Sequence, residues 1–265
     1  GFSDLRRMKR LASADNARFK SLLKLAQSSR ERKKRGLSIL DGVHLVAAYL
    51  EHAGSPSELI VSDGGAQNRE VLALIEAVAP MEPLLLSEQL FGQLSTVATS
   101  TGILATIETP RPPALPAKIG ACVMLEDIQD PGNLGSILRS AAAAGMQHVF
   151  LSQSSVHAWS PRVLRAGMGA HFMLKIYEQC DLTAVMGAFK GRVIATSQRA
   201  PGSVFAADLT GDIAFLFGNE GAGLAPELMA AAQETVAIPM PGKAESLNIA
   251  AAAAVCLFER VRQQG

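Results

Sequence analysis

The chain has 265 residues, of which 48% are hydrophobic, so it can bury one large core or two modest ones. No uncharged apolar run reaches the roughly 18 residues of a membrane span, and no leader pattern opens the chain, so we expect neither a membrane segment nor a secretory signal. Three widely spaced cysteines, Cys122, Cys180 and Cys256, fit neither a disulfide framework nor a metal site. They predict buried thiols in a reducing cytoplasm.

The net charge of +1 hides an uneven distribution along the chain. Residues 6–35 hold 12 of the 25 lysines and arginines, opposed only by Asp15 and Glu31, and the remainder is acidic. The densest part comprises Arg30, Arg32, Lys33, Lys34 and Arg35. Such clusters bind phosphate backbones through counterion release, so this segment predicts contact with nucleic acid, with a solvated helix face as the alternative.

The first hundred residues show an alternation of strand and helix patterns. Apolar residues at helical spacing predict a helix over 15–29. We then expect strands at 37–40, 58–62, 82–86 and 102–107, separated by helices at 44–52, 68–78 and 88–94. The pattern predicts a small three-layer α/β domain. We interpret His44 and His52 as structural, because no second ligand or acid lies at a useful spacing.

A proline-rich segment divides the chain. Residues 108–118 contain Pro110, Pro112, Pro113 and Pro116, a density that favours an extended, semi-rigid spacer. The sequence therefore predicts a first domain at 1–107, a linker at 108–118 and a second domain at 119–265.

The second domain repeats the alternation, with strands expected at 121–125, 148–151, 175–177, 192–196, 213–217 and 235–240. Helices are expected at 133–144, from Pro161, at 182–189 and from Ser246. Arg139 is the only charge in the first of these helices, so it either faces an anion or pairs with Glu126 or Asp127. Arg162 and Arg165 either contact RNA phosphate or lie on a solvated face.

Small-residue loops follow two of these strands, at 218–223 and 241–245. Glycine allows a ligand to approach the main chain closely, and a helix start at Ser246 would add unpaired N–H donors. The order Gly218, Gly221, Gly223 fits neither a P-loop nor a dinucleotide fingerprint. We expect a backbone-lined pocket here, with Thr196 at a neighbouring strand end, and two ordinary tight turns are the alternative.

Three motifs between Asn133 and Asn248 resemble those of the SpoU/TrmH family of the SPOUT superfamily, which are S-adenosylmethionine-dependent RNA 2′-O-ribose methyltransferases. The motifs are Asn133-x-Gly135-x-x-x-Arg139, then Phe217-Gly218-Asn219-Glu220-Gly221-x-Gly223-Leu224, and finally Ile238-Pro239-Met240 with Ser246-Leu247-Asn248. The resemblance implies a catalytic α/β domain with a C-terminal trefoil knot, preceded by a substrate-binding domain similar to a ribosomal-protein fold. The family usually carries Glu-Gly where this chain has Asp41-Gly42.

The resemblance also implies roles for individual residues. The polar catalytic cluster would comprise Asn133, Arg139, Glu220, Ser246 and Asn248. The S-adenosylmethionine site would be lined by Gly218, Ile238 and Leu247, with Thr196 and Met240 as neighbours and no metal. Catalytic domains of the family pair as homodimers, so a homodimer is expected.

The two-domain organisation resembles family members that act on ribosomal RNA more than the compact members that act on transfer RNA, so ribosomal RNA is the expected substrate and transfer RNA the alternative. A non-catalytic RNA-binding or ribosome-assembly factor on the same scaffold is a further alternative, against which the five intact polar residues argue. A dehydrogenase-like nucleotide-binding enzyme is disfavoured by the order of the glycines.

Overall fold

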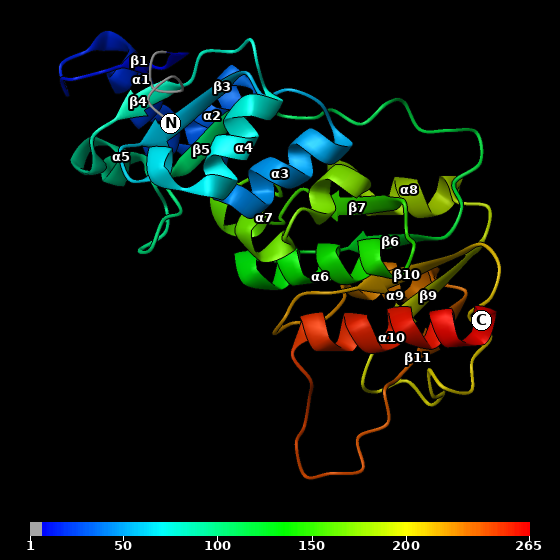
Figure 1. The fold of residues 1–265 in the computed structure, drawn as a ribbon. Helices are drawn as coiled ribbons and strands as arrows, with labels where there is room; N and C mark the ends of the chain where they lie inside the picture. Colours follow the sequence, from blue (N-terminus) through cyan, green and yellow to red (C-terminus); the bar gives the residue numbers. More distant parts are fainter. Residues whose placement is uncertain (1–6) are drawn as a thin grey trace. The chain divides into compact units, whose positions relative to one another are not determined.

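A computed structural model describes residues 7–265, so Arg6, at the start of the basic segment, lies outside the described residues. The chain forms two compact units. The first extends to Pro110 and includes Trp159–Phe172, and the second comprises Arg111–Ala158 and Met173–Gly265 (Figure 1). The predicted alternation of strands and helices is confirmed in both.

The first unit is built on a five-stranded sheet with the order β1-β4-β3-β5-β2. Its strands are β1 (Lys9–Arg10), β2 (Leu37–Asp41), β3 (Glu58–Ser62), β4 (Leu84–Leu86) and β5 (Ile103–Glu108). Strand β5 runs antiparallel to β2 and β3, and the other pairs are parallel. The strands are the expected ones apart from β1, which is too short to leave a periodic pattern in the sequence.

Helices surround this sheet: α1 (Ala17–Gln27), α2 (Ser29–Arg35), α3 (Val43–His52), α4 (Arg69–Ala77) and α5 (Glu88–Leu94). Phe19 of α1 and Phe91 of α5 are buried in one core with Ile60 of β3. The single helix expected over 15–29 ends at Gln27, because Ser28 leaves helical geometry and its hydroxyl caps α2.

The segment 159–172 packs with the first unit although it lies far along the chain. It contains α7 (Pro161–Gly167). Phe172 makes an edge-on ring contact with Tyr49 of α3, and a Cβ on Gly169 would lie 2.9 Å from the Ala48 side chain. The sequence predicts domains at 1–107 and 119–265, joined by a linker at 108–118, so each domain would be one continuous stretch of chain. The compact units instead group residues 159–172 with the first unit.

The second unit contains a six-stranded, wholly parallel sheet in the order β11-β9-β10-β6-β7-β8. Its strands are β6 (Cys122–Leu125), β7 (His148–Ser152), β8 (Lys175–Cys180), β9 (Arg192–Thr196), β10 (Ile213–Phe217) and β11 (Glu234–Val236). Every residue of β6 and β10 is buried, as expected for parallel strands covered on both faces. Strand β11 ends at Val236, earlier than the predicted end at Met240.

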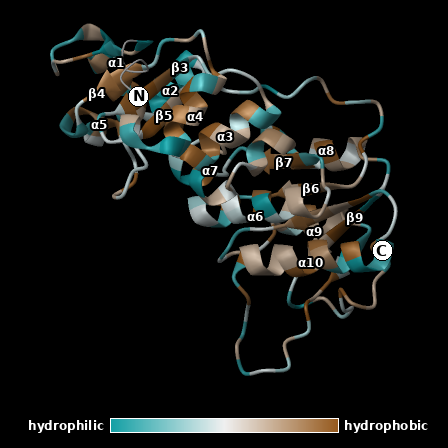
Figure 2. Cartoon of the chain, in the orientation of Figure 1, coloured by the Kyte–Doolittle hydropathy of each residue, from teal (hydrophilic) through white to brown (hydrophobic). Residues whose placement is uncertain are grey.

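Four helices cover this sheet: α6 (Pro131–Ala143), α8 (Leu182–Ala188), α9 (Pro226–Ala231) and α10 (Ile249–Gln264). Helices α8 and α9 share a core with inward residues of the strands, and α6 and α10 lie side by side (Figure 1). Helix α10 is apolar over most of its length and hydrophilic only toward its end (Figure 2). Within residues 7–265, no helix has the length and apolar character needed to cross a bilayer.

The order of the strands creates a topological switch point between β10 and β6. From β6 the chain proceeds outward to β7 and β8, whereas β9, β10 and β11 lie on the other side of β6. In open parallel sheets, ligands bind outside the carboxyl ends of the strands at such a point. The α/β class is confirmed, and the trefoil knot stays a prediction.

Candidate active site

Four loops meet the carboxyl edge of the second sheet. They follow β6 (residues 126–130), β9 (197 onward), β10 (218–225) and β11 (237–248). The predicted catalytic and cofactor residues lie in these loops or at their ends, except Asn133 and Arg139, which lie on α6, the helix that continues from the first loop. The predicted catalytic and cofactor residues therefore belong to a single unit.

The glycine-rich turn after β10 is closed by its own hydrogen bonds. The Asn219 and Gly223 backbones bond reciprocally, at 3.1 and 3.0 Å, and the side chain of Asn219 accepts from the backbone N–H groups of Gly221 and Ala222 at 2.9 Å each. A Cβ on Gly218 would lie 2.5 Å from Gly223 C and from Leu224 N. Gly218 is therefore required because the turn folds back against it, which differs from the expected close approach of a ligand at this position.

Asn219 and Glu220 tie this turn to the loop after β6. Asn219 Nδ2 donates to the Asp127 carbonyl oxygen at 2.7 Å, and Asp127 has a φ of 53°, rare for a residue other than glycine. The Glu220 carboxylate accepts from the backbone N–H groups of Gln129, at 3.1 Å, and of Asp130, at 3.0 Å. These contacts place Glu220 as a clamp on the start of α6, so its chemistry here is that of a hydrogen-bond acceptor.

Asn133 and Asn248, predicted from separate motifs, are in direct contact. Asn248 Nδ2 donates to Asn133 Oδ1 at 2.9 Å. Asn248 Oδ1 accepts from the N–H groups of Ala250 and Ala251, which caps α10. The predicted helix start at Ser246 is wrong, because the cap is Asn248 and α10 begins at Ile249. Ser246 instead lies in an exposed loop, two residues before Asn248. Within the described chain it makes no hydrogen bond with Asn133 or Asn248.

Arg139 is exposed on α6. Within residues 7–265 its guanidinium makes no ion pair or hydrogen bond. The two carboxylates proposed as its partners are bonded elsewhere: Glu126 accepts from Ala225 N at 2.6 Å, and Asp127 accepts from Asn219. The alternative of a structural ion pair is therefore not supported. An arginine without an internal partner is available for an external anion.

The loop after β11 combines unpaired backbone groups with partly exposed apolar side chains. Across the described chain, the backbone of 238–247 forms no hydrogen bond with other backbone groups, so its N–H and C=O groups are free to receive a ligand. Ile238 and Met240 are half-buried, and Leu247 is 39% exposed. Thr196, at the end of β9, donates its hydroxyl to Leu216 O at 3.3 Å. These residues fit a cofactor with an apolar ring and several polar groups.

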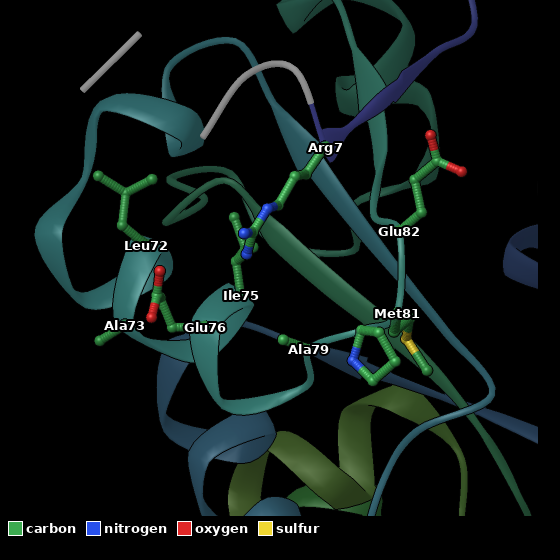
Figure 3. A pocket seen from close by; sticks show the side chains of 9 residues that line it. Arg7, Leu72, Ala73, Ile75, Glu76, Ala79, Met81 and Glu82 are labelled. Carbon is green, nitrogen blue, oxygen red and sulfur yellow. The ribbon is translucent and has the colours of Figure 1, made fainter. Parts of the chain in front are cut away.

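Two cavities are lined by residues other than the predicted catalytic and cofactor residues. One of about 590 Å³ is formed by α4 and residues 79–82 of the first unit, and the Arg7 side chain extends toward Ile75 within it (Figure 3). Another of about 540 Å³ is lined by Glu126, Cys180 and Glu227 with neighbouring polar residues of the second unit. The second cavity borders the loops after β6 and β10 through Glu126 and Ala225, and neither cavity is lined by a predicted catalytic or cofactor residue.

The basic cluster on α2 divides into two kinds of residue. Arg32 is buried, and its guanidinium donates to Leu25 O at 2.9 Å and Ala26 O at 3.0 Å, where it caps the end of α1. Burial lowers the pKa of Arg32. Arg35 donates to the backbone and hydroxyl oxygens of Ser21, each at 3.0 Å. Arg32 therefore has a structural role, whereas Arg35 is exposed although it is bonded to Ser21, and Arg30, Lys33 and Lys34 are also exposed.

The remaining predicted RNA ligands lie on α7, in the first unit. Arg162 and Arg165 are both exposed, and Arg165 Nη1 donates to Thr96 O at 3.3 Å. His44 Nε2 lies 3.1 Å from Met168 O, as suits a structural histidine.

The cysteines are free thiols, and burial raises the pKa of Cys122 and of Cys256 to about 12. Across residues 7–265 no cluster of metal-binding side chains is present.

Comparisons with known proteins show the family to which the chain belongs. A family model for the SpoU rRNA methylase family matches residues 120–258, more than half of the chain. The chain belongs to the SpoU rRNA methylase family. A model for an MRM3-like substrate binding domain matches residues 16–105 of the first unit.

Curated RNA methyltransferases are similar to this chain over nearly its whole length. A tRNA/rRNA methyltransferase of Synechocystis, itself uncharacterized, is 31% identical over 96% of this chain and 94% of its own. The 23S rRNA guanosine 2′-O-methyltransferase RlmP of Bacillus subtilis is 29% identical over 95% of this chain and 98% of its own.

Solved methyltransferase structures match this chain over both units. A crystal structure of an RNA 2′-O ribose methyltransferase superimposes with a TM-score of 0.82 at 28% identity, covering 96% of this chain and 99% of that one. The SpoU methyltransferase AviRb of Streptomyces viridochromogenes, in complex with its cofactor AdoMet, gives a TM-score of 0.84 at 26% identity over 94% and 98% of the two chains.

Proposed function

We infer that this protein transfers a methyl group from S-adenosylmethionine to a ribose 2′-hydroxyl of ribosomal RNA. The observation that carries the inference is Arg139, an unpaired guanidinium on α6, the helix that also carries Asn133 of the Asn133–Asn248 pair, in a chain of the SpoU family. Relatives that match 95% and 84% of this chain are named as 23S rRNA 2′-O-methyltransferases. The first unit, matched by a substrate-binding model, would present the RNA.

S-adenosylmethionine supplies a methyl group on a sulfonium leaving group, so the protein has only to align the reactants and help remove one proton. Loop 238–247 and Thr196 would hold the cofactor, and the tightly packed turn at Gly218 would form one side of the site. Arg139 would bind the phosphate and 2′ oxygen of the target nucleotide. A guanidinium is a donor that does not give up its proton in proteins, so the hydroxyl proton would pass to phosphate or water.

The substrate class is tested by incubating the protein and tritiated S-adenosylmethionine with total RNA from cells that lack its activity, and then separating the RNA by size. Label in large ribosomal RNA is the expected result. Label confined to the transfer-RNA fraction would retain the chemistry and contradict the substrate. Cofactor binding without label in any RNA would contradict the proposed activity and favour the non-catalytic assembly factor.

The exposed cations of α2 are proposed as phosphate ligands. Replacing Arg30, Lys33 and Lys34 together with alanine should weaken RNA binding uniformly and lower the slope of log K against log salt by roughly 0.7 to 0.9 for each phosphate that is no longer neutralised. Binding is measured by fluorescence anisotropy across a salt series. Arg69→Ala, which removes an exposed cation from α4, serves as the control and should leave the slope unchanged. An unchanged slope in the triple variant would contradict the proposal.

A homodimer formed through α10 is also proposed. Phe258 and Val261 of this helix are 46% and 38% exposed, and Leu247, just before the helix, is 39% exposed. A second copy of the chain would cover these apolar side chains. Phe258→Glu should convert the dimer to a monomer, measured by light scattering, because it places a charge in the proposed interface. Phe205→Glu, an equally exposed phenylalanine in a loop, is the control. A wild-type monomer would contradict the proposal.

The protein is proposed to act in the cytoplasm, where its RNA substrate is made and where the three free thiols would stay reduced.

A further inference from the structure

The connection between β9 and β10, residues 197–212, lies directly against the strand that leads into the proposed cofactor loop. Val204 N donates to Ala237 O at 2.8 Å, and Ala237 N donates to Gly202 O at 2.7 Å. Ser203 and Ala237 thereby form a parallel bridge beyond the end of β11. Ala237 immediately precedes Ile238, so the position at which loop 238–247 begins is set by this bridge.

The same connection is held at its other end by α10. Arg260 Nη1 donates to Leu209 O at 2.6 Å. Gln263 makes two bonds: its side-chain oxygen accepts from Leu209 N at 2.8 Å, and its Nε2 donates to Ala207 O at 2.9 Å. Hydrogen bonds from two side chains in the last turns of α10 therefore fix the backbone of 207–209.

The contact is buried, which makes it strong and specific. Arg260 is 8% exposed, and the side chains of Leu209 and Val204 are fully buried. Desolvation lowers the pKa of Arg260, with Asp212 opposing the shift. A buried arginine whose donors face a backbone carbonyl cannot move without leaving polar groups unpaired. The proposed methyl transfer itself uses neither Arg260 nor Gln263.

We propose that Arg260 and Gln263 are positioning residues for the S-adenosylmethionine site: by fixing residues 207–209 they hold the bridge at 202–204 against Ala237 and so set the geometry of loop 238–247. This inference rests on the proposed function. Weakening the hold on 207–209 frees the bridge to shift, and the cofactor loop then has to be ordered by the cofactor itself. The variants should therefore weaken cofactor binding. Arg139 and the Asn133–Asn248 pair should be less affected, because they are positioned by α6 and the start of α10 and not by residues 207–209.

The test compares S-adenosylmethionine binding and steady-state kinetics of the full chain carrying Arg260→Met or Gln263→Leu. Each should raise the Kd, measured by calorimetry, and the KM for S-adenosylmethionine at least about tenfold, equivalent to about 1.4 kcal/mol, the size of one net hydrogen bond. The kcat at saturating cofactor should fall by less than about threefold, since that interaction is lost from ground and transition state alike.

Two further variants separate positioning from general stability. Arg260→Lys keeps a donor to Leu209 O and should recover part of the affinity, and Lys190→Met, which removes an exposed cation near the start of β9, should change nothing. If Arg260→Met does not fold, Gln263→Leu decides, because that side chain is only partly buried. Equal falls in kcat with an unchanged KM would overturn the inference, as would wild-type affinity in Gln263→Leu. A wild-type protein that binds no S-adenosylmethionine would instead contradict the proposed function.

Discussion

Replacing Arg139 with alanine should reduce methyl transfer to RNA by at least about 100-fold while leaving S-adenosylmethionine binding nearly intact. The guanidinium is exposed on α6 and has no partner in the described chain, so its removal leaves no buried group unpaired and should not destabilise the fold. Its proposed partners, the phosphate and 2′ oxygen of the RNA, are present only in the reacting complex. Turnover is measured with labelled cofactor, and binding by calorimetry.

Two companion variants sharpen this test. Arg139→Lys keeps the charge but loses the planar pair of donors, so its activity should lie between those of the wild type and the alanine variant. Ser136→Ala, one turn earlier and also exposed on α6, should be close to wild type. A large loss of cofactor affinity in Arg139→Ala would show that the residue acts on the cofactor site and would contradict its role as an RNA clamp.

A methyl group at Gly218 should have the second largest effect. The added Cβ of Gly218→Ala would lie 2.5 Å from Gly223 C and Leu224 N, which are backbone atoms of a closed turn and cannot move aside like a flexible side chain. We expect the melting temperature to fall in line with a loss of about 1–3 kcal/mol, as for other overpacked sites. The displaced turn should also weaken S-adenosylmethionine binding. Thermal unfolding and calorimetry measure the two effects.

Gly221→Ala is the matched control in the same turn. Its Cβ would meet only Asn219 Oδ1, at 3.7 Å, which is an ordinary contact. The control should therefore retain both stability and binding. If the two alanine variants behaved alike, the turn would be more plastic than its hydrogen bonds indicate, and Gly218 would not be required by packing.

The strands and their order of appearance could be predicted because their signals are local. Strands β3 and β10 match the expected 58–62 and 213–217, since each is a short apolar run between polar turns. Helix ends are harder to place, because they depend on which of several polar residues makes the cap. Ser246 and Asn248 are both good caps in sequence, and the structure shows that Asn248 is the cap, because its side chain accepts from the N–H groups of Ala250 and Ala251.

The residues of the candidate site could be predicted from the sequence motifs, but the hydrogen bonds that hold its loops together could not. Resemblance to the SpoU family groups Asn133 and Asn248 in one catalytic cluster, and the structure joins them by a hydrogen bond. The clamp of Glu220 on the loop before α6, and the bond from Asn219 to Asp127, join residues far apart in the chain and leave no periodic signal. For the same reason the charge pattern could not tell the buried Arg32 from the exposed Lys33, Lys34 and Arg35.

The most direct test of the account is the position of the transferred methyl group. RNA labelled by the protein with tritiated S-adenosylmethionine is hydrolysed completely in alkali, a cleavage that needs a free 2′-hydroxyl. We predict that the label is recovered in alkali-resistant dinucleotides, and that Arg139→Ala yields none. Recovery of the label in mononucleotides, with the methyl group on a base, would contradict the central claim.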